Sequence, residues 1–146
     1  MNNNIYTKDI EFYACSVCGN LIIKLVDSGL NPQCCGRDMI KLEAGTVDAS
    51  SEKHVPVWKM CGCKIIVTVG EEPHPMTKEH YIQWIIVKTN QGIHARKLTP
   101  EDTPEACFKL CKGEEVEAVY EYCNLHKLWK ADAKEAKQDE CNSCGM

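Results

Sequence analysis

The order of apolar and polar positions along the chain predicts short β-strands rather than helices. Residues 64–69 are mostly β-branched and end at Gly70, and residues 81–88 combine aromatic and β-branched side chains. Alternation predicts a third strand over 116–122, with one face formed by Val116, Ala118, Tyr120 and Tyr122. Short strands of this kind indicate a mainly β fold and favour a sandwich.

Turn-forming sequences separate the predicted strands, as a sandwich requires. They are Asn90-Gln91-Gly92, Pro100-Glu101-Asp102 and Lys112-Gly113-Glu114. We expect a linker over 37–49. Residues 130–137 have helix-favouring composition but little apolar face, so we expect a solvated, partly helical tail there.

Composition limits the classes of function. The chain has 146 residues, of which 44% are hydrophobic, enough for one moderate domain and a small one. A net charge of −4 without a basic cluster makes nucleic acid an unexpected partner, and the lack of a long apolar run excludes a membrane span. Eleven cysteines without an apolar export segment in the first ten residues indicate a reducing cytoplasm, with thiols used for metal.

Five potential metal ligands lie in the second half of the chain: His54, His74, His80, Cys123 and His126. Each histidine taken singly is more often a surface or core residue than a ligand. Together, four imidazoles and one thiolate leave a sixth octahedral position open for a small molecule. Because structural zinc sites close at four ligands and catalytic ones take three from the protein, this set points to iron and redox chemistry. His94 has no comparable setting and is left out.

The prolines beside His74 restrict its backbone. Pro73 fixes its own φ, and Pro75 disfavours the helical region for His74, so we expect a stiff, extended segment that presents the imidazole.

A second constellation lies near the N-terminus: Cys15, Cys18, Cys34 and Cys35. Four thiolates suit a tetrahedral zinc or a single iron, and the residue types alone leave that choice open. Neighbouring Cys34 and Cys35 must splay their side chains to reach one ion, so we expect a distorted tetrahedron. Disulfides are the alternative, disfavoured by the lack of an export segment. Because segments below about 40 residues rarely stabilise themselves by burial, this part should fold around its metal.

The chain resembles the desulfoferrodoxin family, the two-iron superoxide reductases, from about residue 12 to about residue 131. The matching motifs, in order, are Cys15-x-x-Cys18 with Cys34-Cys35, Glu52-Lys53-His54-Val55-Pro56, Pro73-His74-Pro75-Met76, His80-Tyr81-Ile82-x-Trp84-Ile85 and Cys123-Asn124-x-His126. The resemblance implies a desulforedoxin-like domain over 1–40 with an Fe(Cys)4 centre, and an immunoglobulin-like β-sandwich over 41–131 with a square-pyramidal Fe(His)4Cys centre. A polar, cysteine-containing tail would occupy 132–146, and the protein would be a homodimer.

The resemblance also implies a function, the one-electron reduction of superoxide to hydrogen peroxide without release of dioxygen, which detoxifies an oxidant. An external donor such as rubredoxin would supply the electron. By the same resemblance, Lys53 attracts the superoxide anion and organises a proton-donating water, and Glu52 occupies the sixth position once the iron is ferric. The alternative for Lys53 and Glu52 is an ordinary solvated pair of charges.

Two other functions remain to be weighed. A rubredoxin-like electron carrier would need only the four-cysteine centre, and a zinc-stabilised binding module would need only ordinary zinc sites. Both leave the five-ligand set without a purpose.

Six cysteines remain without an assigned role: Cys61, Cys63, Cys107, Cys111, Cys141 and Cys144. We expect Cys107 to be a small buried apolar residue. The thiols of Cys141 and Cys144 would be free, or their Cys-x-x-Cys spacing would make a redox-active dithiol or an accessory metal clip.

Overall fold

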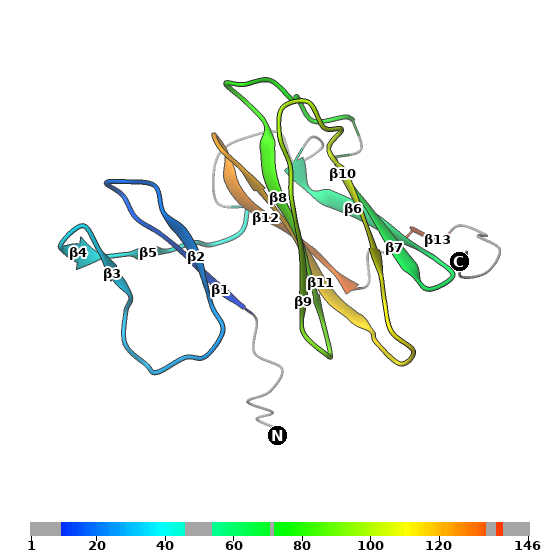
Figure 1. Ribbon diagram of the computed structural model, residues 1–146, viewed down its shortest axis with the longest axis horizontal. Coiled ribbons are helices and arrows are strands. Elements are labelled where there is room, and N and C mark those ends of the chain that lie inside the picture. The colour runs from blue at the N-terminus through cyan, green and yellow to red at the C-terminus, as the bar shows by residue number, and fades with distance from the viewer. Residues whose placement is uncertain (1–9, 46–53, 71, 134–136, 139–146) are drawn as a thin grey trace. The chain divides into compact units, whose positions relative to one another are not determined.

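The computed structural model describes residues 10–45, 54–70, 72–133 and 137–138. The chain forms two compact units, Met1–Glu43 and Ala44–Met146, and strands dominate both (Figure 1). Within the described ranges, no helix is long and apolar enough to cross a membrane.

The N-terminal unit is a small sheet with an added hairpin. The sheet has the strand order β2-β1-β5, and β3 pairs with β4 in a two-stranded ribbon. The strands are β1 (Glu11–Ala14), β2 (Leu21–Lys24), β3 (Gln33–Cys34), β4 (Arg37–Asp38) and β5 (Ile40–Lys41). Among its described residues, the unit buries Phe12 and a small cluster around Tyr13, Cys15 and Met39. So little apolar burial is weak support for an independent fold, and a bound metal would add to it.

The C-terminal unit is a β-sandwich, which confirms the predicted immunoglobulin-like fold class. One sheet has the order β10-β7-β6-β13 and the other β12-β11-β8-β9. The strands are β6 (Pro56–Cys61), β7 (Lys64–Val69), β8 (Ile82–Thr89), β9 (Ile93–Lys97), β10 (Glu105–Lys109), β11 (Val116–Cys123), β12 (Lys127–Asp132) and β13 (Lys137–Gln138).

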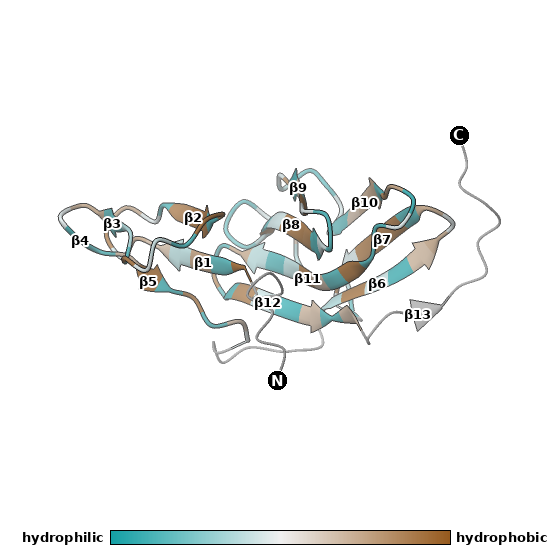
Figure 2. Cartoon of the chain, turned by 90° about the horizontal axis from the view of Figure 1, so that it is seen from below, coloured by the Kyte–Doolittle hydropathy of each residue, from teal (hydrophilic) through white to brown (hydrophobic). Residues whose placement is uncertain are grey.

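The core of the sandwich lies between its two sheets. In β7, Ile65, Val67 and Val69 are buried and alternate with half-buried residues, which is the pattern of a strand with one face toward the core. Figure 2 shows hydrophobic and hydrophilic residues along the strands. The buried cluster comprises Trp58, Ile65, Val67, Val69, Ile82, Ile85, Val87, Leu98, Ala106, Leu110, Val119, Cys123 and Ala131.

All three predicted strands are present. Strand β7 has the predicted bounds, β8 is shifted by one residue at each end, and β11 extends one residue further than predicted. In β11, Val119 and Cys123 belong to the core cluster with Val116 packed against it, and Ala118, Tyr120 and Tyr122 on the other face are buried as well. A register shift between Val116 and Ala118 changes which residues share a face, and β11 is buried on both faces from Ala118 onward.

Three further expectations need correction. The linker begins later than residue 37, because β4 and β5 belong to the N-terminal unit. The predicted partly helical tail contains the end of β12 and the short strand β13 in its described part. Cys107 is exposed rather than buried, because it alternates with Ala106, which faces the core, along β10.

The antiparallel connections divide the sandwich into two ends. The "ligand end" contains the starts of β6, β8 and β12 and the ends of β7 and β11. The "distal end" contains the β6–β7 and β8–β9 turns and the β10–β11 loop. Four predicted ligands, His54, His80, Cys123 and His126, lie at a strand end or within two residues of one. Each of these strand ends belongs to the ligand end.

Glu114 ties the loops of the distal end together. Its carboxylate accepts hydrogen bonds from Thr89 Oγ1 at 2.6 Å, His94 Nε2 at 2.8 Å and the Cys111 backbone N–H at 3.0 Å. These bonds, that from Thr89 above all, lower the pKa of Glu114 to about 2. His94, which we excluded as a metal ligand, therefore has a structural partner.

We expect Glu114→Gln to destabilise the protein by about 1.5 kcal/mol at pH 7, because bonds to a charged group are lost. The folded pKa lies below the ordinary value of 4.5, so the stabilisation is complete above pH 4.5 and is lost as pH falls through about 2. Urea unfolding of both proteins across this range would measure the difference. The exposed neighbour Glu115 supplies the control Glu115→Gln. A constant difference at all pH values would contradict the assignment.

Candidate metal centres

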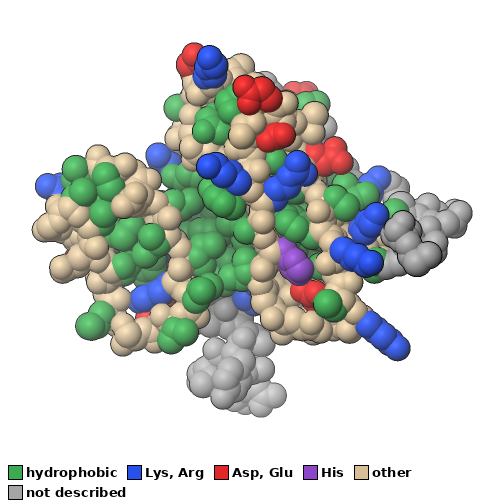
Figure 3. Space-filling view, viewed as in Figure 1, with side chains coloured by type: hydrophobic (Ala, Val, Ile, Leu, Met, Phe, Trp, Pro, Cys, Tyr) green, Lys and Arg blue, Asp and Glu red, His purple; other side chains and the backbone are tan. Residues whose placement is uncertain are grey.

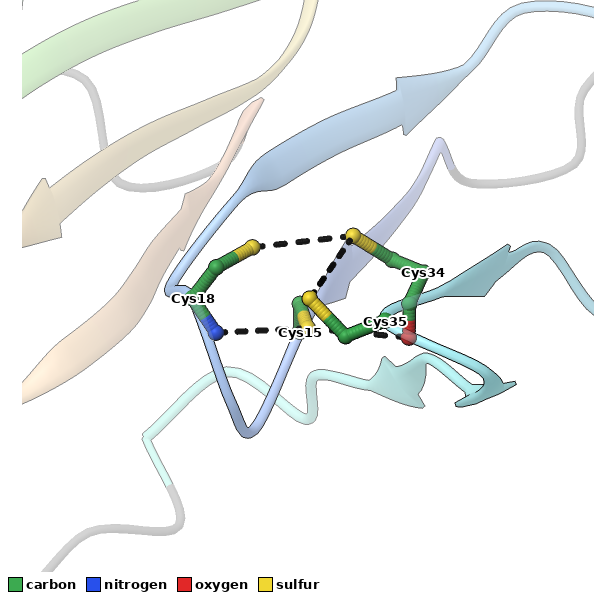
Figure 4. Close-up of side chains that lie close together, drawn as sticks. All are labelled: Cys15, Cys18, Cys34 and Cys35. Atoms are coloured by element: carbon green, nitrogen blue, oxygen red, sulfur yellow. Dashed lines mark hydrogen bonds between the residues drawn. The ribbon is translucent and has the colours of Figure 1, made fainter.

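Four cysteines converge in the N-terminal unit, two from the β1–β2 connection and two from the β3–β4 turn (Figure 4). All four thiols are free of disulfides, and their Sγ atoms lie within 4.8 Å of one another. The Cys18–Cys34 sulfur separation is 3.6 Å, and the Cys34–Cys35 separation is 4.0 Å. A tetrahedral ion with metal–sulfur bonds of ~2.3 Å needs sulfurs about 3.8 Å apart, so the group fits one such ion.

The β3–β4 turn explains how adjacent cysteines can face one site. Cys35 and Gly36 have φ values of 54° and 72°, the left-handed backbone that a two-residue hairpin turn requires. Cys34 ends β3, whereas Cys35 lies in the turn itself, so their side chains need not point to opposite sides. The Cys34–Cys35 sulfur separation is longer than the Cys18–Cys34 separation, and unequal separations of this kind are what a distorted tetrahedron would have.

The pKa values of Cys15 and Cys35 are shifted in opposite directions. Backbone N–H groups of Cys18 and Val17 point at Cys15 Sγ, at 3.5 and 3.4 Å, and lower the pKa of Cys15 to about 6. Hydrogen bonds with the neighbouring thiols, first Cys18 and then Cys15, raise the pKa of Cys35 to about 12. One thiolate therefore suppresses the next, and a bound metal ion would remove this conflict.

Four histidine rings form a square at the ligand end. His54 precedes β6, His74 and His80 lie between β7 and β8, and His126 lies in the β11–β12 turn. Going round the square, neighbouring ring centroids are 4.7, 4.6, 5.0 and 4.6 Å apart, and neighbouring planes cross at 78–86°. His54 and His80 face each other across it at 6.1 Å, with planes 26° apart.

The ring nitrogens approach as ligands of one ion do. His54 Nε2 lies 3.2 Å from His74 Nε2 and 2.8 Å from His126 Nδ1. Adjacent corners of a square with metal–nitrogen bonds of ~2.1 Å lie about 3.0 Å apart. The Nε2 atom of His80 is buried and has no hydrogen-bond partner among the described residues, as a nitrogen directed at a metal position would be.

Cys123, at the end of β11, adds a sulfur to this group. The donor atoms of His54, His74, His80 and Cys123 all lie within 4.8 Å of one another. His126 is not in that closest set, but the 2.8 Å contact of its Nδ1 with His54 places it at the fourth corner. The structure thus brings together all five ligands predicted in the second half of the chain.

His74 is held ready as a neutral ligand. Burial lowers its pKa to about 4, so the ring is uncharged near neutrality. Nδ1 donates a hydrogen bond to the Pro75 carbonyl at 2.7 Å, which leaves Nε2 with a lone pair for a metal. The proline that we expected to stiffen this segment therefore also fixes the tautomer.

Cys123 is fully buried, and burial raises the pKa of its thiol. The backbone N–H groups of His126 and Leu125 oppose this effect but do not reverse it. Such a thiol holds its proton until a cation is present, because a coordinated thiol loses its proton.

Sequence reasoning gave no role to Asn124, which orients the site. Its Oδ1 accepts the Tyr81 backbone N–H at 2.9 Å, and its Nδ2 donates to the Glu79 carbonyl at 3.0 Å. These bonds hold the segment carrying His80 against the turn carrying Cys123. The only signal in the sequence was the place of Asn124 within the Cys123-Asn124-x-His126 motif.

Trp129 and Thr77 support the same ligands. The Trp129 ring lies 5.0 Å from the His54 ring, and its Nε1 donates to the His126 carbonyl at 3.0 Å. Thr77 Oγ1 accepts the His80 backbone N–H at 3.1 Å. Contacts behind a metal ligand of this kind fix its orientation.

Glu121 is an acid inside the sandwich. It is fully buried two residues before Cys123, and neither carboxyl oxygen makes a hydrogen bond within the described residues. Loss of solvent raises the pKa of Glu121 well above its ordinary value, so the group is held neutral. The sequence pattern of β11 did not indicate that Glu121 is buried, because a glutamate in a strand is ordinarily taken for a solvent-facing residue.

Glu52 and Lys53, predicted to act at the open position, lie outside the described residues. Their roles stay predictions.

The fold and the two groups define a class: a β-sandwich metalloprotein with a five-ligand site and a separate four-cysteine unit. The family model described as Desulfoferrodoxin matches residues 46–132. The chain belongs to the desulfoferrodoxin family.

Relatives cover most of the chain. A desulfoferrodoxin from Syntrophotalea carbinolica is 45% identical over 84% of this chain and 96% of its own length. A superoxide reductase from Pyrococcus horikoshii is 33% identical over 66% of this chain and 98% of its own. The crystal structure of the superoxide reductase from Treponema pallidum has a TM-score of 0.73 and 35% identity, and the match covers 86% of this chain and 100% of that one.

We expect Asn124→Ala to weaken metal binding at the five-ligand site by roughly 10- to 100-fold, because ligands lose their orienting contacts. Competition with a chelator, followed by the spectrum of each centre, would measure this, and the four-cysteine centre should not change. Asn90→Ala is the matched control, because Asn90 also makes two hydrogen bonds but at the distal end. Equal losses in both variants would show that only overall stability had changed.

Proposed function

We propose that the chain is a superoxide reductase, which reduces superoxide to hydrogen peroxide by one electron and releases no dioxygen. The observation that carries the proposal is the square of imidazoles with one added thiolate, a set that leaves one position open. We assign His54, His74, His80, Cys123 and His126 as ligands of a reactive iron, and Cys15, Cys18, Cys34 and Cys35 as ligands of a second. When bound, the reactive iron supplies the electron and the coordination position for superoxide.

The protein sets the charge of this site. His74 is neutral because it is buried, and the hydrogen bond to Pro75 directs its lone pair inward. An imidazole binds a metal ion through the lone pair of a neutral ring. Of the five ligands Cys123 would therefore be the only anion, and a site loaded with a ferrous ion would keep a net positive charge. That charge favours approach of the superoxide anion. The thiolate also increases electron density at the metal, which favours transfer of an electron to the substrate.

Glu52 and Lys53 belong to the proposal through their position, directly before His54 in the chain. Lys53 would raise the local concentration of superoxide and organise a water that delivers a proton to the product. Glu52 would occupy the open position after the electron has been transferred.

The four-cysteine centre would hold the N-terminal domain together, with an optional role in electron transfer. Within the proposed organisation, residues 1–40 form this domain, 41–131 the reactive domain and 132–146 a tail. Each turnover consumes one electron, so a small external carrier of the rubredoxin type is the proposed donor. The proposed location is the cytoplasm.

A homodimer is also part of the proposal. The N-terminal unit exposes apolar side chains, and burying them against a second copy of the chain would be favourable. Figure 3 shows hydrophobic side chains on the surface of this unit. The exposed residues are Val17 (58%), Leu25 (79%), Val26 (85%), Leu30 (74%) and Ile40 (55%).

The function is tested by reacting anaerobically prepared, iron-loaded protein with superoxide. We expect one peroxide for each superoxide consumed and no dioxygen beyond the uncatalysed background. In Cys18→Ser, the spectrum of the four-thiolate centre should be lost while the second-order rate with superoxide is retained. Dioxygen formed in equal amount with peroxide would indicate dismutation, and loss of the rate in Cys18→Ser would show that the centres are coupled. Zinc in both sites, or no reaction, would favour a structural or electron-carrier role.

We expect Lys53→Ala to slow the second-order reaction with superoxide by ~10-fold or more, because electrostatic steering raises encounter rates by about 10- to 1,000-fold. The dependence of the rate on ionic strength should flatten. Stopped-flow or pulse-radiolysis rates at several salt concentrations would measure both effects. Lys112→Ala, an exposed lysine at the distal end, is the control. If the rate and its dependence on ionic strength did not change, Lys53 would be an ordinary solvated charge.

A further inference from the structure

Six cysteines lie outside the two metal centres. Cys61 and Cys63 take part in disulfides, and Cys107 and Cys111 are exposed free thiols. The two tail cysteines, Cys141 and Cys144, lie outside the described residues, so the roles expected for them stay predictions.

The sulfurs of the four-cysteine centre differ in their access to solvent. Cys15 is buried and Cys34 is half-buried, whereas Cys18 and Cys35 are exposed. Water can donate hydrogen bonds to the two exposed sulfurs. The two less accessible sulfurs depend more on donors from the protein, because a charge removed from water without a partner raises the free energy.

Cys15 obtains its donors from its own turn. The backbone N–H groups of Val17 and Cys18 point at Cys15 Sγ, at 3.4 and 3.5 Å. The donors are thus the second and third residues after the accepting cysteine, which is the geometry that the Cys15-x-x-Cys18 spacing provides.

The second pair of cysteines has a different turn. Cys34 is followed directly by Cys35, and the chain reverses at once so that Cys34 pairs with Arg37 across a two-residue hairpin. Among the described residues, the N–H donor to Cys34 Sγ is instead a side chain, that of Asn20, whose Nδ2 lies 3.5 Å from the sulfur. This distance matches those of the backbone bonds to Cys15.

The backbone holds Asn20 in place for this contact. Its carbonyl accepts the Cys15 N–H at 2.9 Å, and the Cys15 carbonyl accepts the Gly19 N–H at 3.0 Å. Gly19 has a φ of 78°, which favours glycine, and it turns the chain into β2. The Asn20 side chain therefore starts beside the first pair of cysteines and reaches a sulfur of the second pair.

A donor at a thiolate affects the two oxidation states of a bound iron unequally. Four thiolates around iron carry one more negative charge when the iron is ferrous than when it is ferric. An N–H that points at a sulfur stabilises the more negative state more, so it raises the reduction potential. Hydrogen bonds to sulfur are among the features that set the potentials of cysteine-ligated iron.

We propose that Asn20 tunes the four-cysteine centre: its side-chain N–H stabilises the Cys34 thiolate and raises the reduction potential of the iron held there. The centre is then reduced more readily by an external carrier. The proposal rests on the proposed assignment of the four cysteines as iron ligands, but not on the reaction with superoxide. The two proposals can therefore fail separately.

Two variants remove the donor in different ways. Asn20→Leu replaces the amide by an apolar group of similar size, which also hinders water from taking its place. Asn20→Asp keeps the shape but puts an acceptor and a negative charge beside the sulfur. In the full chain loaded with iron, both variants should have a lower potential at the four-cysteine centre, and Asn20→Asp should have the lowest.

The size of the effect follows from the loss of a hydrogen bond to a charged group at a partly exposed site. At the midpoint potential of the wild type, we expect the ratio of reduced to oxidised centre to fall about threefold to tenfold in Asn20→Leu. Tenfold corresponds to about 59 mV for a one-electron couple. Spectroelectrochemical titration of the four-thiolate band measures the ratio. The band should also move to lower energy, because a sulfur without its donor releases electron density to iron more easily.

Asn31→Asp is the matched control. Asn31 is another exposed amide of the same unit, so this variant adds the same charge without removing the donor to Cys34. It should leave the band energy unchanged and shift the potential less than Asn20→Asp does. The spectrum of the five-ligand centre is the internal reference and should be the same in all variants.

A measurement on the wild type tests the hydrogen bond itself. When cadmium occupies a thiolate site, an N–H···S bond transmits a scalar coupling between the amide proton and the metal, which NMR detects. We expect this coupling for the side-chain amide of Asn20. The measurement needs no variant, so it decides the matter even if the Asn20 variants fail to load iron.

Two outcomes would overturn the proposal. A wild-type potential and band energy in iron-loaded Asn20→Leu would show that the amide does not tune the centre, even if the variant loses iron more readily. The absence of coupling to the Asn20 amide in the cadmium-loaded protein would show that the hydrogen bond is not made.

Discussion

The close approach of nitrogen atoms inside a largely buried site is the constraint on which the rest of the structure depends. His54 Nε2 lies near both His74 Nε2 and His126 Nδ1, and His74 already donates its other nitrogen to Pro75. A single proton on His54 can satisfy only one of these two contacts, and burial disfavours extra charge. A metal cation satisfies all of the lone pairs at once, and it also ionises the buried thiol of Cys123. The strands that end at this site therefore support an arrangement that is unfavourable without its metal.

The sequence predicted the ligands more fully than it predicted the packing. Ligands were found because residue type and spacing are written in the chain, as in Pro73-His74-Pro75, and the alternation in β7 gave its bounds. The alternation in β11 did not indicate its packing, because a register shift near Val116 changes the parity of the strand, and both of its faces are buried. Glu121 and the orienting role of Asn124 depend on contacts between distant segments, which no local pattern contains.

The two centres relate to their scaffolds in opposite ways. The four-cysteine group lies on a unit with a very small core, and its thiols oppose one another's ionisation, so metal and fold support each other there. The sandwich has an extensive core of its own, and its ligands come from strand ends and short connections. Loss of metal should therefore threaten the fold of the first unit and the chemistry of the second. An open coordination position belongs on the scaffold that does not need its metal to fold.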